Sequence, residues 1–451
     1  VSGSMIGSGI FIVTSDISRQ LNSGALVLVA WLIAGFMTIA GGLCYGEFAC
    51  AWPEAGGQYV YLKNIWGKLM GFLYGWTFFL VIETGTIAAI SIAFAKFLSI
   101  VVPQISSDNK ILSVLGFEIS MLQMTAVLLI VVLTYINTRG VKSGALIQNI
   151  FTSTKILALL GVIFCGLFIG FNKHTLLLNL STGLHLNAFK DMNITSAMAI
   201  ALVGALFASD SWANVTFIAG EIKKPEKNLP RALFLGISIV ILLYILINFS
   251  YFSVLTIDNI KTAHADVVGA ALIGFIFGNI GQIAVSLIIL ISAVGCVNGI
   301  ILSGARVYYA MAKDGLFFEK IAVLNEKTNA PQNALIIQGI WASLLIFSGS
   351  FLQLLDYVVF ASLLFYILTI GGVFIFRRKY QDMQLPYRTA FYPYLPALYC
   401  ILATFIAINL LIYKPAYTWP GLLIVLSGVP VYFLKRAYSK ASINKSLEIN
   451  D

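Results

Sequence analysis

The chain has 451 residues, of which 59% are hydrophobic and only 10% are charged, and its mean hydropathy is +0.92. Soluble domains carry about 25% charged residues, so this composition excludes an ordinary water-soluble protein and favours one surrounded largely by lipid. The net charge of +9 does not indicate nucleic-acid binding, because the basic residues are spread over many short connections and form no separate basic domain.

Apolar runs follow one another along the whole chain, and each is about 20 residues long or longer, which fits membrane-spanning helices and exceeds the ~10 residues of a barrel strand. We therefore expect an all-α polytopic membrane protein with one domain over residues 1–451. Its twelve expected helices lie near residues 1–20, 25–51, 69–102, 120–137, 145–171, 192–221, 230–255, 281–312, 332–349, 352–376, 391–413 and 416–434. The third, sixth and eighth are too long for simple spans and should be tilted or interrupted. Residues 256–280 have a mixed pattern that predicts a loop with a short helix.

The first expected helix contains the glycine-rich stretch GSMIGSGIF, from Gly3 to Phe11. Glycine allows the backbone to leave helical geometry, and a break at membrane depth is tolerated where it lines a cavity. The free N–H groups where the helix resumes, near Ser8, would attract a carboxylate. Close packing of small residues explains the motif equally well by itself. Because the chain starts inside this helix, at Val1, we expect the first span to be truncated.

A second candidate break lies in the sixth expected helix, in the stretch FASDSW from Phe207 to Trp212. Serine and aspartate weaken a helix by bonding to its backbone, and an aspartate at mid-membrane costs roughly 2.5–3.5 kcal/mol unless it faces water, a partner or a ligand. Carbonyls exposed by such a break suit an ammonium group. Interrupted helices at corresponding positions of two halves indicate a transporter built on inverted repeats. The two breaks together therefore predict a site for both charged ends of an amino acid.

Four further charged residues lie inside expected helices. Lys155 is about 10 residues into the fifth helix, or roughly 15 Å along it, and is either a cross-brace to backbone carbonyls or a cation at a coupling site. Glu83, in the third helix, either pairs with a polar neighbour or faces the pathway and contributes to proton coupling or substrate choice. Lys96 lies near a helix end and should reach the interface, and Glu47 should be structural.

The distribution of lysine and arginine predicts the orientation in the membrane. Of the 28, 20 fall in alternate connections on one side and six on the other, and Lys96 and Lys155 lie within helices. By the positive-inside rule, both termini face the cytoplasm of a multi-pass protein in the cell (inner) membrane.

The cysteines and histidines provide no catalytic or metal-binding pattern. All five cysteines lie in apolar runs, so no disulfide is expected, and none has metal-ligand spacing to a histidine. The three histidines, His174, His185 and His264, lie in predicted loops. We expect no metal and no cofactor, and a membrane enzyme is excluded because it would need a polar constellation at one depth.

Four motifs together resemble the amino acid–polyamine–organocation superfamily: GSMIGSGIF, YGEFACAWPEAGGQYVYL, FASDSW followed by EIKKPEKNLPRA, and RVYYAMAKDG. With the lysine inside the fifth helix, they look most like the bacterial members of its L-type amino acid transporter branch, and the resemblance covers the whole chain. It implies a LeuT-like fold in which two inverted repeats of five helices, about residues 1–171 and 192–376, precede two peripheral helices at about 391–434.

The resemblance also implies a substrate site at the two breaks. Ser8 and Gly9 would contact the substrate carboxylate, and Phe207 would be an occluding aromatic, although plain packing also explains that ring. Lys155 would stand where sodium-driven relatives place a cation, bridging the first, fifth and eighth helices near Ser292. The implied binding residues are Ser4, Met5, Gly7, Ser8, Gly9, Phe207, Ala208, Ser209, Asp210 and Ser211, with carbonyls of Met5, Phe207, Ala208 and Asp210 holding the amine.

Two residues depart from the family pattern FAYDGW, because Ser209 replaces the tyrosine and Ser211 replaces the glycine. The smaller Ser209 would open the pocket, and Ser211 would restrict the backbone. Human relatives of this branch join a partner glycoprotein through a cysteine after the third helix. Residues 102–120 contain no cysteine, so no disulfide-linked heavy chain is expected.

The sequence therefore predicts a secondary active transporter that moves neutral L-amino acids across the plasma membrane by alternating access, as an exchanger. Proton-coupled symport stays open, and transport of cationic amino acids or polyamines is a less favoured alternative. A twelve-helix carrier for sugars or drugs would lack the paired breaks, and a channel would need a filter-like loop that the sequence does not show.

Overall fold

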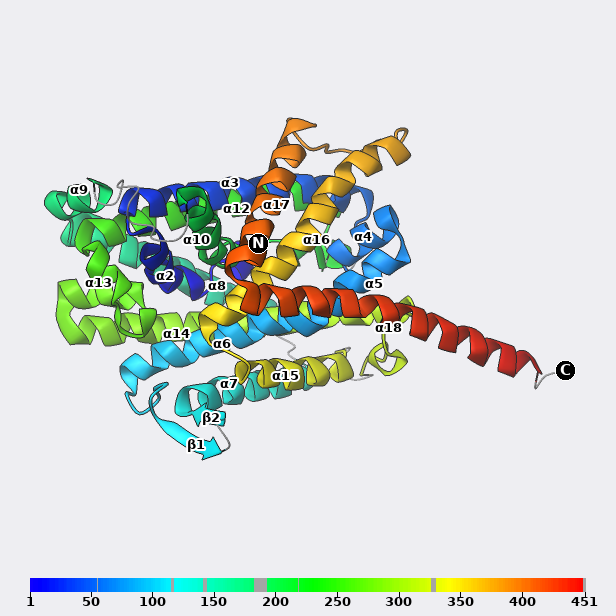
Figure 1. The fold of residues 1–451 in the computed structure, drawn as a ribbon, viewed down its shortest axis with the longest axis horizontal. Coiled ribbons are helices and arrows are strands. Elements are labelled where there is room, and N and C mark those ends of the chain that lie inside the picture. The colour runs from blue at the N-terminus through cyan, green and yellow to red at the C-terminus, as the bar shows by residue number, and fades with distance from the viewer. Residues whose placement is uncertain are drawn as a thin grey trace.

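The structure is a computed structural model that describes residues 1–54, 56–114, 117–140, 144–181, 193–217, 219–325 and 330–448. Figure 1 shows a bundle in which long helices run in a common direction, while α16 and α17 cross the others at an angle. In this view the N-terminus lies over the middle of the bundle and the C-terminal end of α18 projects beyond it.

The elements of the first half are α1 (Ser2–Met5), η1 (Gly9–Phe11), α2 (Val13–Leu21), α3 (Gly24–Ala51), α4 (Gln58–Trp66), α5 (Lys68–Thr77), η2 (Phe78–Ile82), α6 (Glu83–Val101), β1 (Lys110–Val114), β2 (Phe117–Ser120), α7 (Met121–Thr138), α8 (Gly144–Phe164), η3 (Cys165–Ile169) and α9 (Lys173–Ser181). Those of the second half are α10 (Ile194–Ala208), α11 (Asn214–Phe217), η5 (Ala219–Glu221), α12 (Pro225–Val254), α13 (Ile257–Lys261), η6 (His264–Asp266), α14 (Val268–Lys313), η7 (Glu319–Ile321), α15 (Gln332–Ile346), α16 (Phe351–Lys379), α17 (Tyr394–Tyr413) and α18 (Pro415–Glu448).

Nine helical segments among the described residues are long and apolar enough to cross a bilayer, and α10 and α15 are shorter apolar helices. Large apolar side chains cover the outside of the bundle, including Leu128, Leu157 and Leu423. Leu157, for example, is 68% exposed, as expected of a side chain that faces lipid. The prediction of a polytopic helical membrane protein is confirmed.

Small residues allow several of these helices to pack closely. Helix α3 packs along α12, and a Cβ added at Gly35 of α3 would overlap the side chain of Ile241 in α12. The same holds for Gly42 of α3 and Ile237 of α12. Close approach through glycine is a common way to pack helices in a membrane, where water does not drive apolar side chains together.

Two of the three expected helices that were too long for simple spans contain an irregularity. The third has a π-helical turn, η2, between α5 and α6. The sixth stops at Ala208 and resumes at Asn214. The eighth expected helix, residues 281–312, is helical throughout, but α14 begins earlier, at Val268. It bends at Gly278, ahead of the expected start, where a φ of +69° lies in the region that favours glycine. The short helix predicted within residues 256–280 is α13, but the expected loop is shorter than predicted, because residues 268–280 form the start of α14.

Four small elements were not predicted from the sequence. Strands β1 and β2 form an antiparallel hairpin where only a loop was expected, so the all-α description was incomplete. A single two-stranded hairpin buries little apolar surface, and its hydrophobic pattern is correspondingly weak. Helices α4 and α9 lie in stretches that were expected to be connections, because their mixed composition does not resemble a membrane span.

Candidate functional site

The first helix of the chain is interrupted at its glycine-rich stretch. Helix α1 ends at Met5, Ile6 adopts an extended conformation, and the chain resumes as the 3-10 turn η1 at Gly9 before continuing as α2. Ser8 is fully buried, and its hydroxyl has no hydrogen-bond partner among the described residues. The first N–H groups of a helix have no partner within it, so the restart at Gly9 presents donors at this position.

The second interruption follows α10. The chain leaves helical geometry after Ala208, and α11 begins at Asn214. Between them, Ser211 has a φ of +66°, a left-handed conformation that costs a residue with a side chain about 1–2 kcal/mol. A serine therefore occupies a position where the backbone itself favours glycine.

The structure brings the two interruptions together. Helix α10 packs against α2 and η1, although nearly 200 residues separate them in the chain. A Cβ added at Gly9 would lie 3.3 Å from the Cβ of Ala208, which is tighter than an ordinary contact. Gly9 and Ala208 therefore form a close contact that leaves no room for a larger side chain.

Tyr244 of α12 connects both interruptions. Its hydroxyl oxygen lies 3.0 Å from the carbonyl oxygen of Met5 and 3.2 Å from that of Ala208. A hydroxyl has one proton, so it donates to one of these carbonyls at a time and leaves the other free to accept from another donor. The sequence analysis missed Tyr244 because it lies in an uninterrupted apolar run. A tyrosine well inside a span, away from the interface where tyrosines gather, was the available signal.

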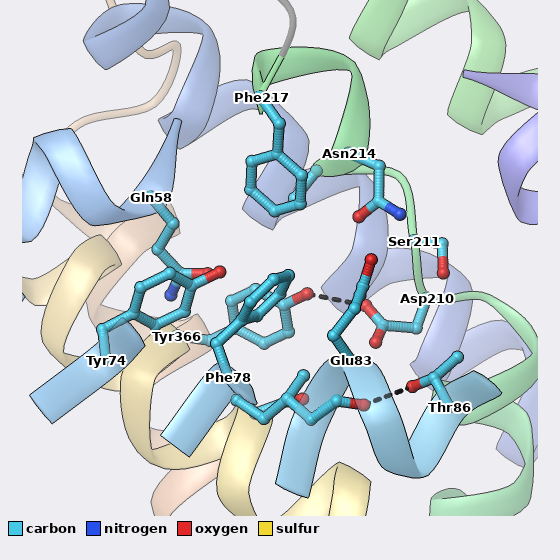
Figure 2. Close-up of a pocket in the computed structure, with 13 residues that line it drawn as sticks. Gln58, Tyr74, Phe78, Glu83, Thr86, Asp210, Ser211, Asn214, Phe217 and Tyr366 are labelled. Atoms are coloured by element: carbon cyan, nitrogen blue, oxygen red, sulfur yellow. Dashed lines mark hydrogen bonds between the residues drawn. The ribbon is translucent and has the colours of Figure 1, made fainter. Parts of the chain in front are cut away.

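Three of the expected site residues make contacts with their own helix or its neighbours. The ring of Phe207 packs edge-on against Phe351 of α16, with ring centres 6.1 Å apart. Ser209 is fully buried and donates its hydroxyl to the carbonyl of Ala205, 2.8 Å away. Ser209 does not line the pocket of Figure 2, and the expectation that its small side chain enlarges the substrate site stays a prediction. The Ser4 hydroxyl likewise donates to the carbonyl of Val1.

Lys155 of α8 reaches the first interrupted helix. Its side chain is 1% exposed, and its ammonium donates to the carbonyl of Gly3 at 3.0 Å. Cys296 of α14 also packs against the first interruption, because a Cβ added at Gly7 would lie 3.4 Å from the Cys296 sulfur. The hydroxyl of Ser292, also in α14, is buried without a hydrogen-bond partner among the described residues, so the expected bridge to Ser292 does not include a direct bond.

A small pocket, with an enclosed volume of about 20 Å³, lies beside the second interruption (Figure 2). Its walls come from α4, the α5–η2–α6 segment, the α10–α11 interruption and α16. The Tyr366 hydroxyl donates to Asp210 at 2.6 Å, and the Glu83 side chain points into the same space. Neither Met5 nor any other residue of the first interruption lines it. The lining residues are Gln58, Tyr74, Phe78, Ile82, Glu83, Thr86, Asp210, Ser211, Ala213, Asn214, Phe217, Ser362 and Tyr366.

A polytopic helical bundle in which two interrupted helices meet is the architecture of a membrane transporter for small solutes. The chain belongs to the amino acid permease family, whose pattern matches residues 1–432. This finding confirms the family resemblance seen in the sequence.

Curated relatives agree with that assignment. The chain is 30% identical to the serine/threonine exchanger SteT of Bacillus subtilis, over 96% of this chain and 94% of that protein. It is also 30% identical to the human large neutral amino acids transporter small subunit 2, over 96% of this chain and 78% of that one. The mouse Asc-type amino acid transporter 1 matches at 30% identity, over 96% and 79% respectively.

Proposed function

We propose that this chain is a secondary active transporter that exchanges neutral L-amino acids across the cell membrane by alternating access. The observation that carries the proposal is the meeting of the two interruptions, where Gly9 contacts Ala208 and the Tyr244 hydroxyl reaches the carbonyls of Met5 and Ala208. The names of its relatives, a serine/threonine exchanger and transporters of neutral amino acids, support this substrate class.

In this mechanism the two ends of the substrate use different parts of the interruptions. The carboxylate binds the free N–H groups at Ser8 and Gly9, where the positive end of a helix dipole adds to the attraction. The ammonium donates to whichever of the two carbonyls, Met5 or Ala208, the Tyr244 hydroxyl leaves free. Because Gly9 and Ala208 are in contact, the interruptions must separate to admit a substrate, and their contact afterwards closes the site.

We further propose the LeuT-like layout for this chain, with one transmembrane domain of two inverted repeats at about 1–171 and 192–376 and peripheral helices at about 391–434. In its support, the nine long apolar segments, the interrupted pairs α1–α2 and α10–α11, and the shorter α15 give twelve spans. These twelve spans occur along the chain in the same order as the twelve apolar runs of the sequence.

The proposed orientation places the C-terminus, and the side from which the chain enters its first helix, in the cytoplasm. Helix α4, which carries Lys63, lies at the right of Figure 1 with the C-terminal end of α18. The β1–β2 hairpin, α9 and α13, whose connections hold fewer basic residues, lie at the left. The right-hand end would then face the cytoplasm.

We propose that the transporter works without a disulfide-linked heavy chain. Residues 102–120 contain no cysteine, and all five cysteines lie in apolar helices and are unpaired. A covalent link to a partner would need a cysteine exposed outside the membrane.

Replacing Gly9 tests the proposed site. A Gly9→Leu variant should abolish amino acid uptake in proteoliposomes while still inserting and purifying normally, because its side chain would clash with Ala208 and prevent the interruptions from closing. Gly161→Leu is the matched control, since a Cβ at Gly161 meets nothing within 4 Å. Unimpaired uptake by Gly9→Leu would remove the interruptions from the substrate site.

A further inference from the structure

The pocket of Figure 2 holds two carboxylates and no counter-charge. Glu83 and Asp210 both line it, and no lysine, arginine or histidine is among its described lining residues. The Glu83 side chain is 3% exposed, and its Oε1 atom has no hydrogen-bond partner in the described part of the chain. A buried carboxylate oxygen without a partner is costly, so a cationic occupant would relieve an unfavourable arrangement.

Neutral polar groups of the same pocket are also unsatisfied. Ser362 is 6% exposed, and its hydroxyl has no partner among the described residues. The side-chain amide nitrogen of Asn214 is in the same situation. Buried polar atoms in a protein normally have a partner, and groups that lack one from several elements around one cavity indicate a missing ligand. The π-helical turn η2, directly before Glu83, is a feature that often occurs at functional sites.

Aromatic rings complete the walls and restrict the kind of ligand. Tyr74, Phe78, Phe217 and Tyr366 line the pocket with the two carboxylates, and the rings of Phe78 and Phe217 pack edge-on, with centres 5.4 Å apart. Aromatic faces combined with carboxylates are suited to organic ammonium groups. The enclosed volume of about 20 Å³ has room for one water-sized group, which matches an ammonium head group.

We propose that this pocket is a second binding site, separate from the Gly9–Ala208 contact, for an organic ammonium group held by Glu83 and Asp210 within the aromatic walls. The inference rests on the proposed function in one respect: an amino acid released from the interruptions would place its ammonium here before leaving the protein. The pocket begins at Asp210, two residues beyond the proposed ammonium acceptor Ala208, so the passage from one site to the other is short in the chain.

Binding of a simple amine to the purified full chain tests the site without requiring transport. The probe is propylamine, protonated at neutral pH, and 1-propanol is its neutral counterpart. Propylamine should raise the thermal stability of the wild type saturably, because a ligand that binds only the folded state stabilises it, and 1-propanol should not. Glu83→Gln should weaken amine binding by about tenfold or more, the effect of losing a charge-assisted hydrogen bond. Glu118→Gln, on the exposed hairpin, should bind the amine as the wild type does.

Equal amine binding by the wild type and Glu83→Gln would overturn the proposal. Absence of amine binding to the wild type would also overturn it and would leave a proton as the neutralising occupant. If Glu83→Gln fails to fold, Phe217→Leu keeps both carboxylates and tests the aromatic wall: weaker amine binding supports the site, and unchanged binding contradicts it. Failure of the proposed function is distinguishable, because amino acid exchange would then be absent while amine binding persisted.

Discussion

At the scale of single residues, Tyr244 and Lys155 hold the first interruption from two neighbouring helices. Tyr244 of α12 reaches the carbonyl of Met5, and Lys155 of α8 reaches the carbonyl of Gly3. Both contact backbone atoms that an intact helix would have used internally. The interruption is thus defined by its surroundings as well as by its own glycines.

Replacing Lys155 separates its two possible roles. Lys155→Met keeps most of the side-chain length but removes the donor to Gly3, which should lower stability by roughly 1–3 kcal/mol and slow amino acid exchange. Thermal unfolding and exchange in proteoliposomes measure the two effects, with Lys110→Met on the exposed hairpin as the control. Reduced stability with exchange kinetics identical to the wild type would leave only the structural brace.

Ser211 offers a test of backbone strain. Its φ of +66° favours glycine, so Ser211→Gly should raise the free energy of unfolding by about 1 kcal/mol. Ser209→Gly is the control, because Ser209 has a right-handed conformation and should gain nothing. The midpoint of thermal unfolding in detergent measures both, and a lower midpoint for Ser211→Gly would contradict the strain.

At the scale of elements, a cluster of charged residues joins α2, α6 and η6 near the second interruption. Asp266 accepts from Arg19 of α2 at 2.9 Å and from Lys96 of α6 at 2.6 Å. Lys96 lies 5.7 Å from the centre of the Phe351 ring, which packs on Phe207. The cluster therefore lies over the aromatic pair beside the second interruption, and Lys96 is paired instead of free at the interface.

The charge state of Asp266 should make the stability of its cluster with Arg19 and Lys96 sensitive to acid. Burial by itself would raise the pKa of Asp266, but Lys96 and Arg19 outweigh it and hold that pKa below its ordinary value of 3.8. A carboxyl whose pKa is lowered by folding stabilises the fold above its ordinary pKa and loses that contribution as the pH falls through the lowered value. Thermal stability should therefore fall below about pH 4, and Asp266→Asn should be less stable at pH 7 and show a smaller acid dependence. Equal acid dependence in both proteins would contradict this assignment.

The sequence predicted both interruptions because their causes are local. Glycines at 3, 7 and 9 and the polar run at 209–211 weaken a helix wherever it packs. The pocket was predictable only in part, since Gln58, Ser362 and Tyr366 reach it through the packing of α4 and α16 against the interruption. Tyr244 and the closed contact between Gly9 and Ala208 likewise depend on packing between distant segments, which a sequence pattern does not specify.

At the scale of the whole molecule, the two interruptions are in contact while an open pocket lies beside one of them. A single chain that binds substrate where two helices break can close that site by moving one group of helices against the other. The alternating-access proposal requires such a movement, and exchange requires that it occur readily only when substrate is bound.

Counterflow in proteoliposomes tests the proposed exchange most directly. Purified protein is reconstituted with or without internal unlabelled neutral amino acid, and uptake of radiolabelled serine, alanine and leucine is measured at two pH values without an imposed ion gradient. Exchange predicts that internal amino acid is required for rapid uptake and that a pH gradient alone does not drive it. Equally rapid uptake into vesicles without internal amino acid, or accumulation driven by a proton gradient, would contradict it.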